Sequence, residues 1–150
     1  MGEVIAGVEV HPLRIIADAR GAVLHMIRAD NPRFAPFGEI YFSEAAPGVV
    51  KAWKRHRKMT QRFAVPEGRI RLAIYDDRQG CATQGALQVL ELGRPDAYHL
   101  VIVPALLWYG FAAMGERPAL MANCADLPHD PAEYELLDLA QAVGRIPYAW

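Results

Sequence analysis

Short runs in which apolar and polar residues alternate recur along most of the chain, a pattern typical of β-strands with one buried face. In the clearest run, Arg69–Tyr75, three aliphatic residues share one face and two arginines share the other. Similar runs, separated by turns rich in Gly, Pro and Asp, cover 22–27, 37–43, 49–53, 62–65, 86–92, 98–103, 108–111 and 120–124. A strand within 4–14 would carry Pro12, which fits a sheet edge. The pattern predicts an all-β sandwich or barrel.

The end of the chain changes character. Asp130 can cap a helix, with Pro131 at its first position and Glu133 at its third. An apolar stripe and a closing glycine follow, made of Leu136, Leu137, Ala140, Val143 and Gly144. These residues predict a short C-terminal helix packed against the barrel.

The stretch 48–68 carries a dense basic cluster between two strand-like runs. Strand parity places Val50, Ala52, Lys54, His56 and Lys58 on one face, and Val49, Lys51, Trp53, Arg55 and Arg57 on the other. A half-buried strand normally carries charge on one face only. Charge on both faces therefore indicates that one face lines a polar, ligand-holding interior.

The same stretch resembles the first cupin motif, in which a glycine, a His-x-His pair, a glutamate and a second glycine follow at characteristic spacing. Gly48, Lys54, His56, Gln61 and Gly68 occupy these places. Protonated lysine has no lone pair for a metal, and a glutamine amide is a weak neutral ligand. In the run that resembles the second motif, Tyr109 occupies the place of the last metal histidine. The resemblance implies a cupin-type antiparallel barrel (jelly roll), and the altered ligands predict no metal.

Composition narrows the class of protein. The 150 residues predict one domain, 1–150, and the net charge of −1 gives no general attraction to nucleic acid or membrane. The two cysteines do not suggest a disulfide scaffold, which favours a reduced, cytoplasmic chain. No apolar run is long enough to span a bilayer, and no secretory leader is recognised.

Among cupins, the chain resembles the dTDP-4-dehydrorhamnose 3,5-epimerase family over nearly its whole length. The resemblance is carried by DARG at 18–21, FGEIYFS at 37–43, PGVVKAW at 47–53, YDDR at 75–78, WYGF at 108–111 and NCAD at 123–126. It implies a cofactor-free homodimer that acts on a nucleotide-linked 4-keto-6-deoxy sugar. By position, Arg20 matches a nucleotide-binding arginine lent to the partner's site. Glu39 and Tyr41 match polar substrate contacts, and Lys51 matches the arginine of an Arg-Gly-x-His run.

Several positions depart from the family pattern. Lys54 stands at the place of the catalytic histidine, and Tyr109 at the place of the histidine in His-Gly-Phe. The family's catalytic tyrosine has no counterpart. Related sugar 3,4-ketoisomerases carry His-x-His followed by Lys and Gln, to which His56, Lys58 and Gln61 correspond. The resemblance therefore implies a divergent member and leaves epimerase and ketoisomerase chemistry open.

Enolate chemistry beside a ketone needs a base, a cationic or hydrogen-bonding group for the enolate, and an acid. Lys54 and His56 are the candidate bases, and Tyr109 is the candidate acid. The remaining candidates contact the substrate: Lys51 and Lys58 through the diphosphate or enolate oxygen, Gln61 through its amide, and Trp108 by stacking.

The leading hypothesis is a metal-independent sugar-nucleotide epimerase or isomerase of surface polysaccharide or deoxysugar synthesis. A non-catalytic sugar-nucleotide-binding module is the alternative, because both family catalytic residues are replaced. Nucleic-acid binding through WKRHRK conflicts with the overall charge, and a metal-dependent dioxygenase conflicts with the missing ligands.

Overall fold

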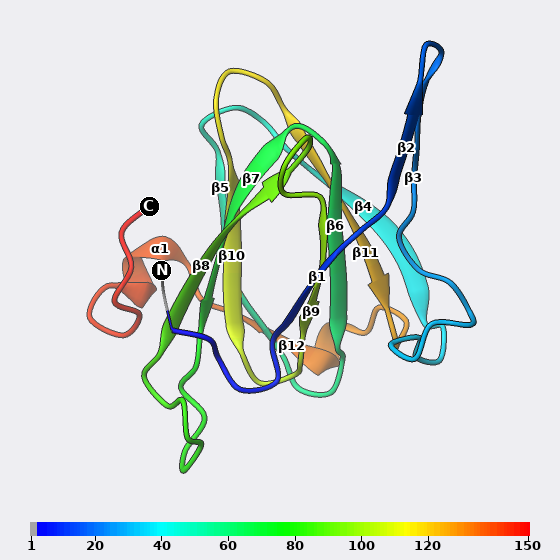
Figure 1. Cartoon of the computed structure of the whole chain (residues 1–150). Helices are drawn as coiled ribbons and strands as arrows, with labels where there is room; N and C mark the ends of the chain where they lie inside the picture. The colour runs from blue at the N-terminus through cyan, green and yellow to red at the C-terminus, as the bar shows by residue number, and fades with distance from the viewer. Residues whose placement is uncertain (1–2) are drawn as a thin grey trace.

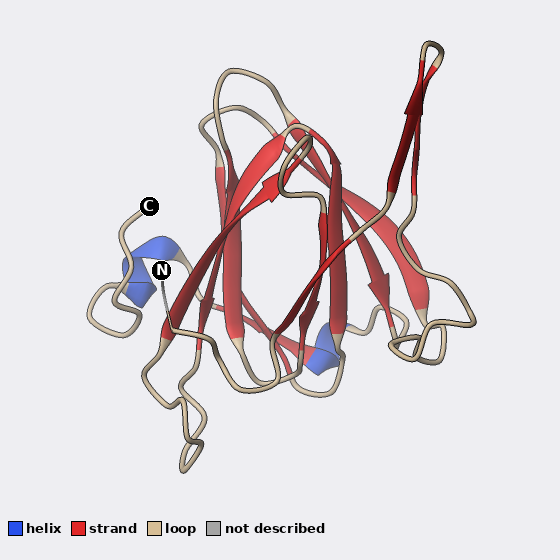
Figure 2. Cartoon of the chain, viewed as in Figure 1, coloured by secondary structure: helices blue, strands red, loops and turns tan. Residues whose placement is uncertain are grey.

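Two antiparallel sheets face each other and form a barrel in the computed structural model, which describes residues 3–150 (Figure 1). The first sheet has the order β1 (Glu9–Pro12), β9 (His99–Val103), β6 (Gln61–Glu67), β11 (Ala119–Ala125) and β4 (Glu39–Ala45). The second has the order β12 (Tyr134–Leu136), β5 (Val50–His56), β10 (Trp108–Ala113), β7 (Arg69–Tyr75) and β8 (Leu87–Gly93). Strands dominate, with only short helical pieces (Figure 2). The predicted all-β, cupin-type barrel is confirmed.

A separate hairpin extends away from the barrel. Its strands, β2 (Ile15–Asp18) and β3 (Gly21–Leu24), pair only with each other within residues 3–150 (Figure 1). Nothing in the described chain covers its exposed apolar residues Ile16 and Val23. The strand order also confirms that β1 is an edge strand, as Pro12 predicts.

The core lies between the two sheets and is built from the inward residues of each strand. Ile70, Leu72 and Ile74 of β7 are fully buried, which confirms the alternation in that run. Phe63 of β6 and Val101 of β9 meet them from the facing sheet. Period-two patterning thus decides which face of these strands is buried.

A second apolar layer covers the outer face of the β5–β10 sheet. Trp53 and Trp108 belong to this layer, together with Leu137 and Ile146 from the C-terminal segment. The ring of Trp150 lies 5.4 Å from that of Trp53. The C-terminal segment is therefore docked on the barrel, as its aromatic residues predict.

The prediction of a helix beginning at Asp130 is wrong. Asp130 caps only a 3₁₀ turn, η1 (Pro131–Glu133), after which β12 pairs with the edge of β5. The helix α1 (Leu139–Ala142) begins later, where Asp138 forms a capping box with Gln141. Pairing with an open sheet edge outweighs the local helix signal in this segment.

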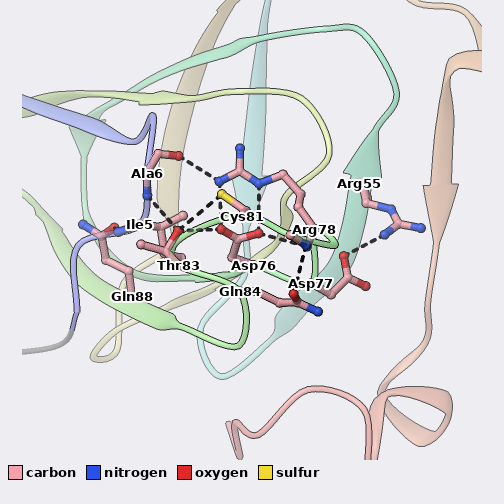
Figure 3. A network of polar contacts seen from close by, with 11 residues as sticks. Ile5, Ala6, Arg55, Asp76, Asp77, Arg78, Cys81, Thr83, Gln84 and Gln88 are labelled. Carbon is pink, nitrogen blue, oxygen red and sulfur yellow. Dashed lines mark hydrogen bonds and ion pairs between the residues drawn. The ribbon is translucent and has the colours of Figure 1, made fainter.

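A buried carboxylate ties the start of the chain to the β7–β8 loop (Figure 3). Asp76 is fully buried and accepts hydrogen bonds from Arg78 and from Thr83 Oγ1, the latter at 2.7 Å. Arg78 donates to the Ala6 carbonyl, and the Ala6 amide donates to Thr83. Burial alone would raise the pKa of Asp76, but these hydrogen bonds outweigh burial and hold its pKa at about 2.

Within residues 3–150, no helix has the length and apolarity needed to cross a bilayer.

Candidate active site

A cavity of about 410 Å³ opens at one side of the barrel, where β5 and β10 face β4 and β11. Its polar wall groups are Tyr41, Ser43, Lys51, Lys54 and Tyr109. Its apolar wall is formed by Val50, Ala52, Trp53, Phe111, Met121 and Leu136. A concave, mostly apolar space with a few convergent polar groups is typical of a small-molecule site.

A β-bulge in β5 brings two lysines to this cavity. Lys54 pairs with Tyr109 and Lys51 pairs with Phe111, so Ala52 and Trp53 together oppose the single residue Gly110. The extra residue reverses the alternation of side chains along β5. The prediction that Lys51 and Lys54 lie on opposite faces is therefore wrong, because both line the cavity.

The closeness of the two backbones explains the glycine at position 110. A Cβ atom added there would overlap the Cβ of Ala52 and would lie 3.0 Å from the Trp150 ring. Gly110 thus lets the bulge pack closely against β10, which sets the positions of Lys54 and Tyr109.

The two lysines have different surroundings. Lys51 donates to Ser43 Oγ at 2.7 Å and to the Glu44 carbonyl at 3.2 Å. Lys54 Nζ lies 4.2 Å from the centre of the Tyr134 ring. Burial lowers the pKa of Lys54, with a smaller lowering from Lys51, while Glu133 and Glu39 oppose the change. Lys54 therefore has more of its neutral amine form at a given pH than a free lysine.

Behind the cavity wall, three buried polar side chains are in contact. Tyr109 Oη lies 3.3 Å from His56 Nε2, and His56 Nδ1 lies 2.7 Å from Glu133 Oε2. His56 is absent from the cavity lining, so its contact toward the cavity runs through Tyr109. Burial raises the pKa of Tyr109 well above its ordinary value and lowers that of His56, which Glu133 opposes.

Sequence reasoning missed Glu133. It assigned this residue to a helix start, where an acidic residue is unremarkable. A usable signal is its position directly before β12, the strand that lies beside the basic stretch of β5.

A second network supports Tyr41 from the facing sheet. Asn123 donates from Nδ2 to Tyr41 Oη at 2.9 Å and to Gln61 Oε1, and its own oxygen accepts from the Arg62 amide. Gln61 and Asn123 are both buried, and Gln61 Nε2 has no hydrogen-bond partner among residues 3–150. Gln61 therefore lies behind the site, where it orients Tyr41 through Asn123.

Besides Gln61, four predicted substrate contacts lie away from the cavity wall. Arg20 is at the hairpin tip, paired with Asp18, with its side chain 89% exposed. Trp108 packs in the outer layer and donates to Asp77, and alternation along β10 already places it on the face opposite Tyr109. Lys58 and Glu39 also lie outside the cavity wall. Lys58 lines a separate surface hollow, and Glu39 accepts from the His129 amide.

The basic stretch does not form one charged surface. Lys54 points into the cavity and His56 lies behind its wall, whereas Arg55 points outward and pairs with Asp77 at 2.9 Å and with Glu135 at 2.6 Å. This arrangement gives nucleic acid no continuous row of free cations on β5.

No group of three or more His, Cys, Asp or Glu side chains that could hold a metal occurs between residues 3 and 150. The cupin ligand places hold Lys54, His56, Gln61 and Tyr109, of which Gln61 and His56 already bond to other side chains.

Comparison with known proteins assigns the chain to a family. No protein-family model matches it. It is 37% identical over 146 residues to the probable low-salt glycan biosynthesis epimerase Agl13 of Haloferax volcanii, covering 96% of this chain and 88% of the relative. It belongs to the family of sugar epimerases and isomerases related to dTDP-4-dehydrorhamnose 3,5-epimerase. The resemblance found in the sequence is confirmed, and the chain is an enzyme.

Solved structures agree with this assignment. A dTDP sugar isomerase of Desulfovibrio desulfuricans superimposes with a TM-score of 0.93 at 51% identity, over 97% of this chain and 92% of that one. ChmJ, a 3′-monoepimerase of Streptomyces bikiniensis solved with dTDP-quinovose, has a TM-score of 0.85 at 16% identity, over 99% and 77% of the two chains. The second match shows that the enzyme shares its fold with more distant proteins.

Proposed function

We propose that the enzyme epimerises or isomerises a nucleotide-linked 4-keto-6-deoxy sugar by removing and returning a proton beside the ketone. The observation that carries this proposal is a cross-strand pair of proton-transfer groups, Lys54 on β5 and Tyr109 on β10, at the wall of one cavity. The relative named as a dTDP sugar isomerase supports a dTDP-linked substrate. Relatives named for glycan and spore coat polysaccharide biosynthesis support a role in making surface polysaccharide.

Each wall group has a role in this chemistry. Lys54 acts as the base, since burial favours its neutral amine and it stands at the cavity wall. Lys51 supplies positive charge that stabilises the enolate oxygen. Tyr109 is the acid that returns the proton, and its raised pKa keeps the phenol protonated until then. Phe111 and Met121 form an apolar wall suited to the deoxy methyl group.

The substrate class is tested by hydrogen exchange. The protein is incubated in deuterated water with dTDP-, GDP- and CDP-linked 4-keto-6-deoxy sugars, and the sugar hydrogens are followed by NMR. Exchange at a carbon beside the ketone with one donor supports the proposal and identifies the carbon. Saturable binding without exchange for every donor would instead indicate a sugar-nucleotide-binding protein.

We also propose that two copies form a homodimer through the hairpin and the outer face of β4. The hairpin projects from the barrel (Figure 1), and Ile40 and Phe42 on β4 are 51% and 60% exposed. Exposed large apolar residues on one strand face favour a protein partner. In such a dimer, Arg20, which pairs with Asp18 at the exposed hairpin tip, would meet a phosphate in the partner's cavity.

The cytoplasm is the proposed location. Cys81 and Cys124 are both unpaired, which suits a reducing compartment.

A further inference from the structure

The contacts from Tyr109 through His56 to Glu133 lead from the cavity wall into the protein interior. Tyr109 lines the cavity, whereas His56 and Glu133 lie behind it, and the three residues are 6%, 4% and 8% exposed, respectively. Solvent therefore has little access to the Tyr109 hydroxyl, and the group positioned to exchange a proton with it is His56 Nε2 at 3.3 Å. A hydrogen bond of this length is common in unliganded sites, where such contacts shorten when substrate binds.

Glu133 fixes the protonation pattern of this chain of contacts. Its Oε1 accepts from the backbone amides of Lys58 at 3.0 Å and Met59 at 2.7 Å, while Oε2 contacts His56 Nδ1. Burial alone would raise the pKa of Glu133, but the hydrogen bonds from His56, Lys58 and Met59 outweigh burial and lower it. An ionised carboxylate requires a proton on Nδ1, so Nε2 is the nitrogen that faces Tyr109.

We propose that Glu133 is the positioning residue of a Glu133–His56–Tyr109 relay that reloads the catalytic phenol during sugar epimerisation or isomerisation. The proposal rests on the function proposed above and adds a residue that the cavity wall does not contain. Glu133 acts through His56 by holding the imidazole in the tautomer and orientation that Tyr109 needs. It touches neither substrate nor cavity.

The proton transfers balance. A sugar C–H bond breaks and the proton forms an N–H bond on Lys54. The Tyr109 O–H bond breaks as its proton bonds to an enolate carbon, and the Nε2 proton of the His56 imidazolium passes to the Tyr109 oxygen. His56 is then neutral, with its Nδ1–H donated to Glu133. The enzyme is restored when the Lys54 proton passes to the Tyr109 oxygen while the Tyr109 proton passes to His56 Nε2. Lys54 and His56 therefore share one proton between them.

The charges around Lys54 and His56 favour the protonation of one of these two groups at a time. Burial lowers the pKa of His56, Glu133 opposes that effect, and the charge of Lys54 adds to the lowering. Lys54 and His56 therefore disfavour carrying positive charge together, while Glu133 stabilises the imidazolium when Lys54 is neutral.

The test is Glu133→Gln. Glutamine keeps the size of the side chain, and its oxygen can still accept from the Lys58 and Met59 amides. Its NH₂ would then donate to Nδ1, which moves the imidazole proton to Nε2 and removes the charge that stabilises the imidazolium. We expect turnover to fall by about 10²- to 10⁴-fold with little change in KM or melting temperature. The ¹⁵N signals of His56, assigned with His56→Gln, should report the change of tautomer without substrate.

The matched control is Glu135→Gln on β12, where the carboxylate pairs with Arg55 outside the barrel. Turnover of this variant should stay within about twofold of wild type.

A double variant gives a second test. Tyr109→Phe combined with Glu133→Gln should be no slower than Tyr109→Phe alone, because both changes break one relay. An unchanged His56 tautomer in Glu133→Gln, or additive losses in the double variant, would overturn the proposal. The tautomer readout needs no substrate, so it fails separately from the proposed function.

Discussion

At the residue scale, burial has opposite consequences for the ionisable groups of this barrel. At Lys54 burial dominates and lowers the pKa, which raises the fraction of neutral amine where a base is needed. At Asp76 burial is outweighed by the hydrogen bonds of Arg78 and Thr83, which keep the carboxylate ionised in a structural role. Hydrogen-bond partners, not burial alone, therefore separate the group suited to catalysis from the group that stabilises the fold.

Asp76 gives a prediction about acid stability. The pKa of Asp76 in the folded protein is about 2, below the ordinary value of 3.8. The contribution of its carboxylate to the free energy of unfolding is therefore complete above pH 3.8 and is lost as the pH falls toward 2. Asp76→Asn should lower the free energy of unfolding at pH 7 by about 2 kcal/mol, with a smaller difference near pH 2. Denaturant titrations at both pH values measure this. The exposed Asp96, paired with Arg69, is the control, and Asp96→Asn should change little. An equal loss for Asp76→Asn at both pH values would contradict the account.

At the element scale, one extra residue in β5 decides which side chains meet in the cavity. The alternation of apolar residues was enough to predict β7 and the other main strands, because each strand buries one face. It could not predict that Lys51 joins Lys54, since parity counting assumes no bulge. The same alternation could have excluded Trp108 from the cavity wall, because adjacent residues of a strand, here Trp108 and Tyr109, point to opposite faces. Glu133 and β12 were missed because local capping signals do not report a distant sheet edge.

Gly110 provides a test of the bulge. Gly110→Ala forces a Cβ against Ala52, and overpacking of this kind costs about 1–3 kcal/mol of stability. The substitution should also separate Lys54 from Tyr109. The rate of deuterium exchange into the sugar should therefore fall by more than the loss of folded protein explains. Thermal melts and exchange rates at a temperature where the variant is folded check this. Ala112→Gly, which removes a methyl group from the same strand without overlap, should keep nearly normal activity. Full activity in Gly110→Ala would show that the close approach is dispensable.

At the scale of the whole molecule, the described chain leaves two features without a partner. The hairpin extends from the barrel (Figure 1). The outer face of β4 exposes Phe42 and Ile40. Sequence reasoning reached a dimer only through the family resemblance, because patterning predicts which face of a strand is apolar but not what covers it. The position of Arg20, far along the hairpin from its own barrel, is consistent with a site completed by a second copy.

Phe42→Asp tests the dimer. A charge on the outer face of β4 should disfavour burial of that face, so sedimentation velocity should show a monomer where the wild type is a dimer. Val143→Asp, at a still more exposed apolar position after α1 on the other sheet's side, should leave the dimer intact. A monomeric wild-type protein would contradict the proposed assembly.

The central claim is that Lys54 removes a proton from a sugar carbon beside a ketone. Its most direct test is the rate of deuterium incorporation into a dTDP-linked 4-keto-6-deoxy sugar, compared between wild type, Lys54→Met and the outward-facing control Arg71→Met. The account predicts wild-type exchange at one or two carbons beside the ketone, normal exchange in Arg71→Met, and a loss of about 10²- to 10⁴-fold in Lys54→Met. Undiminished exchange in Lys54→Met would contradict the assignment of Lys54 as the base.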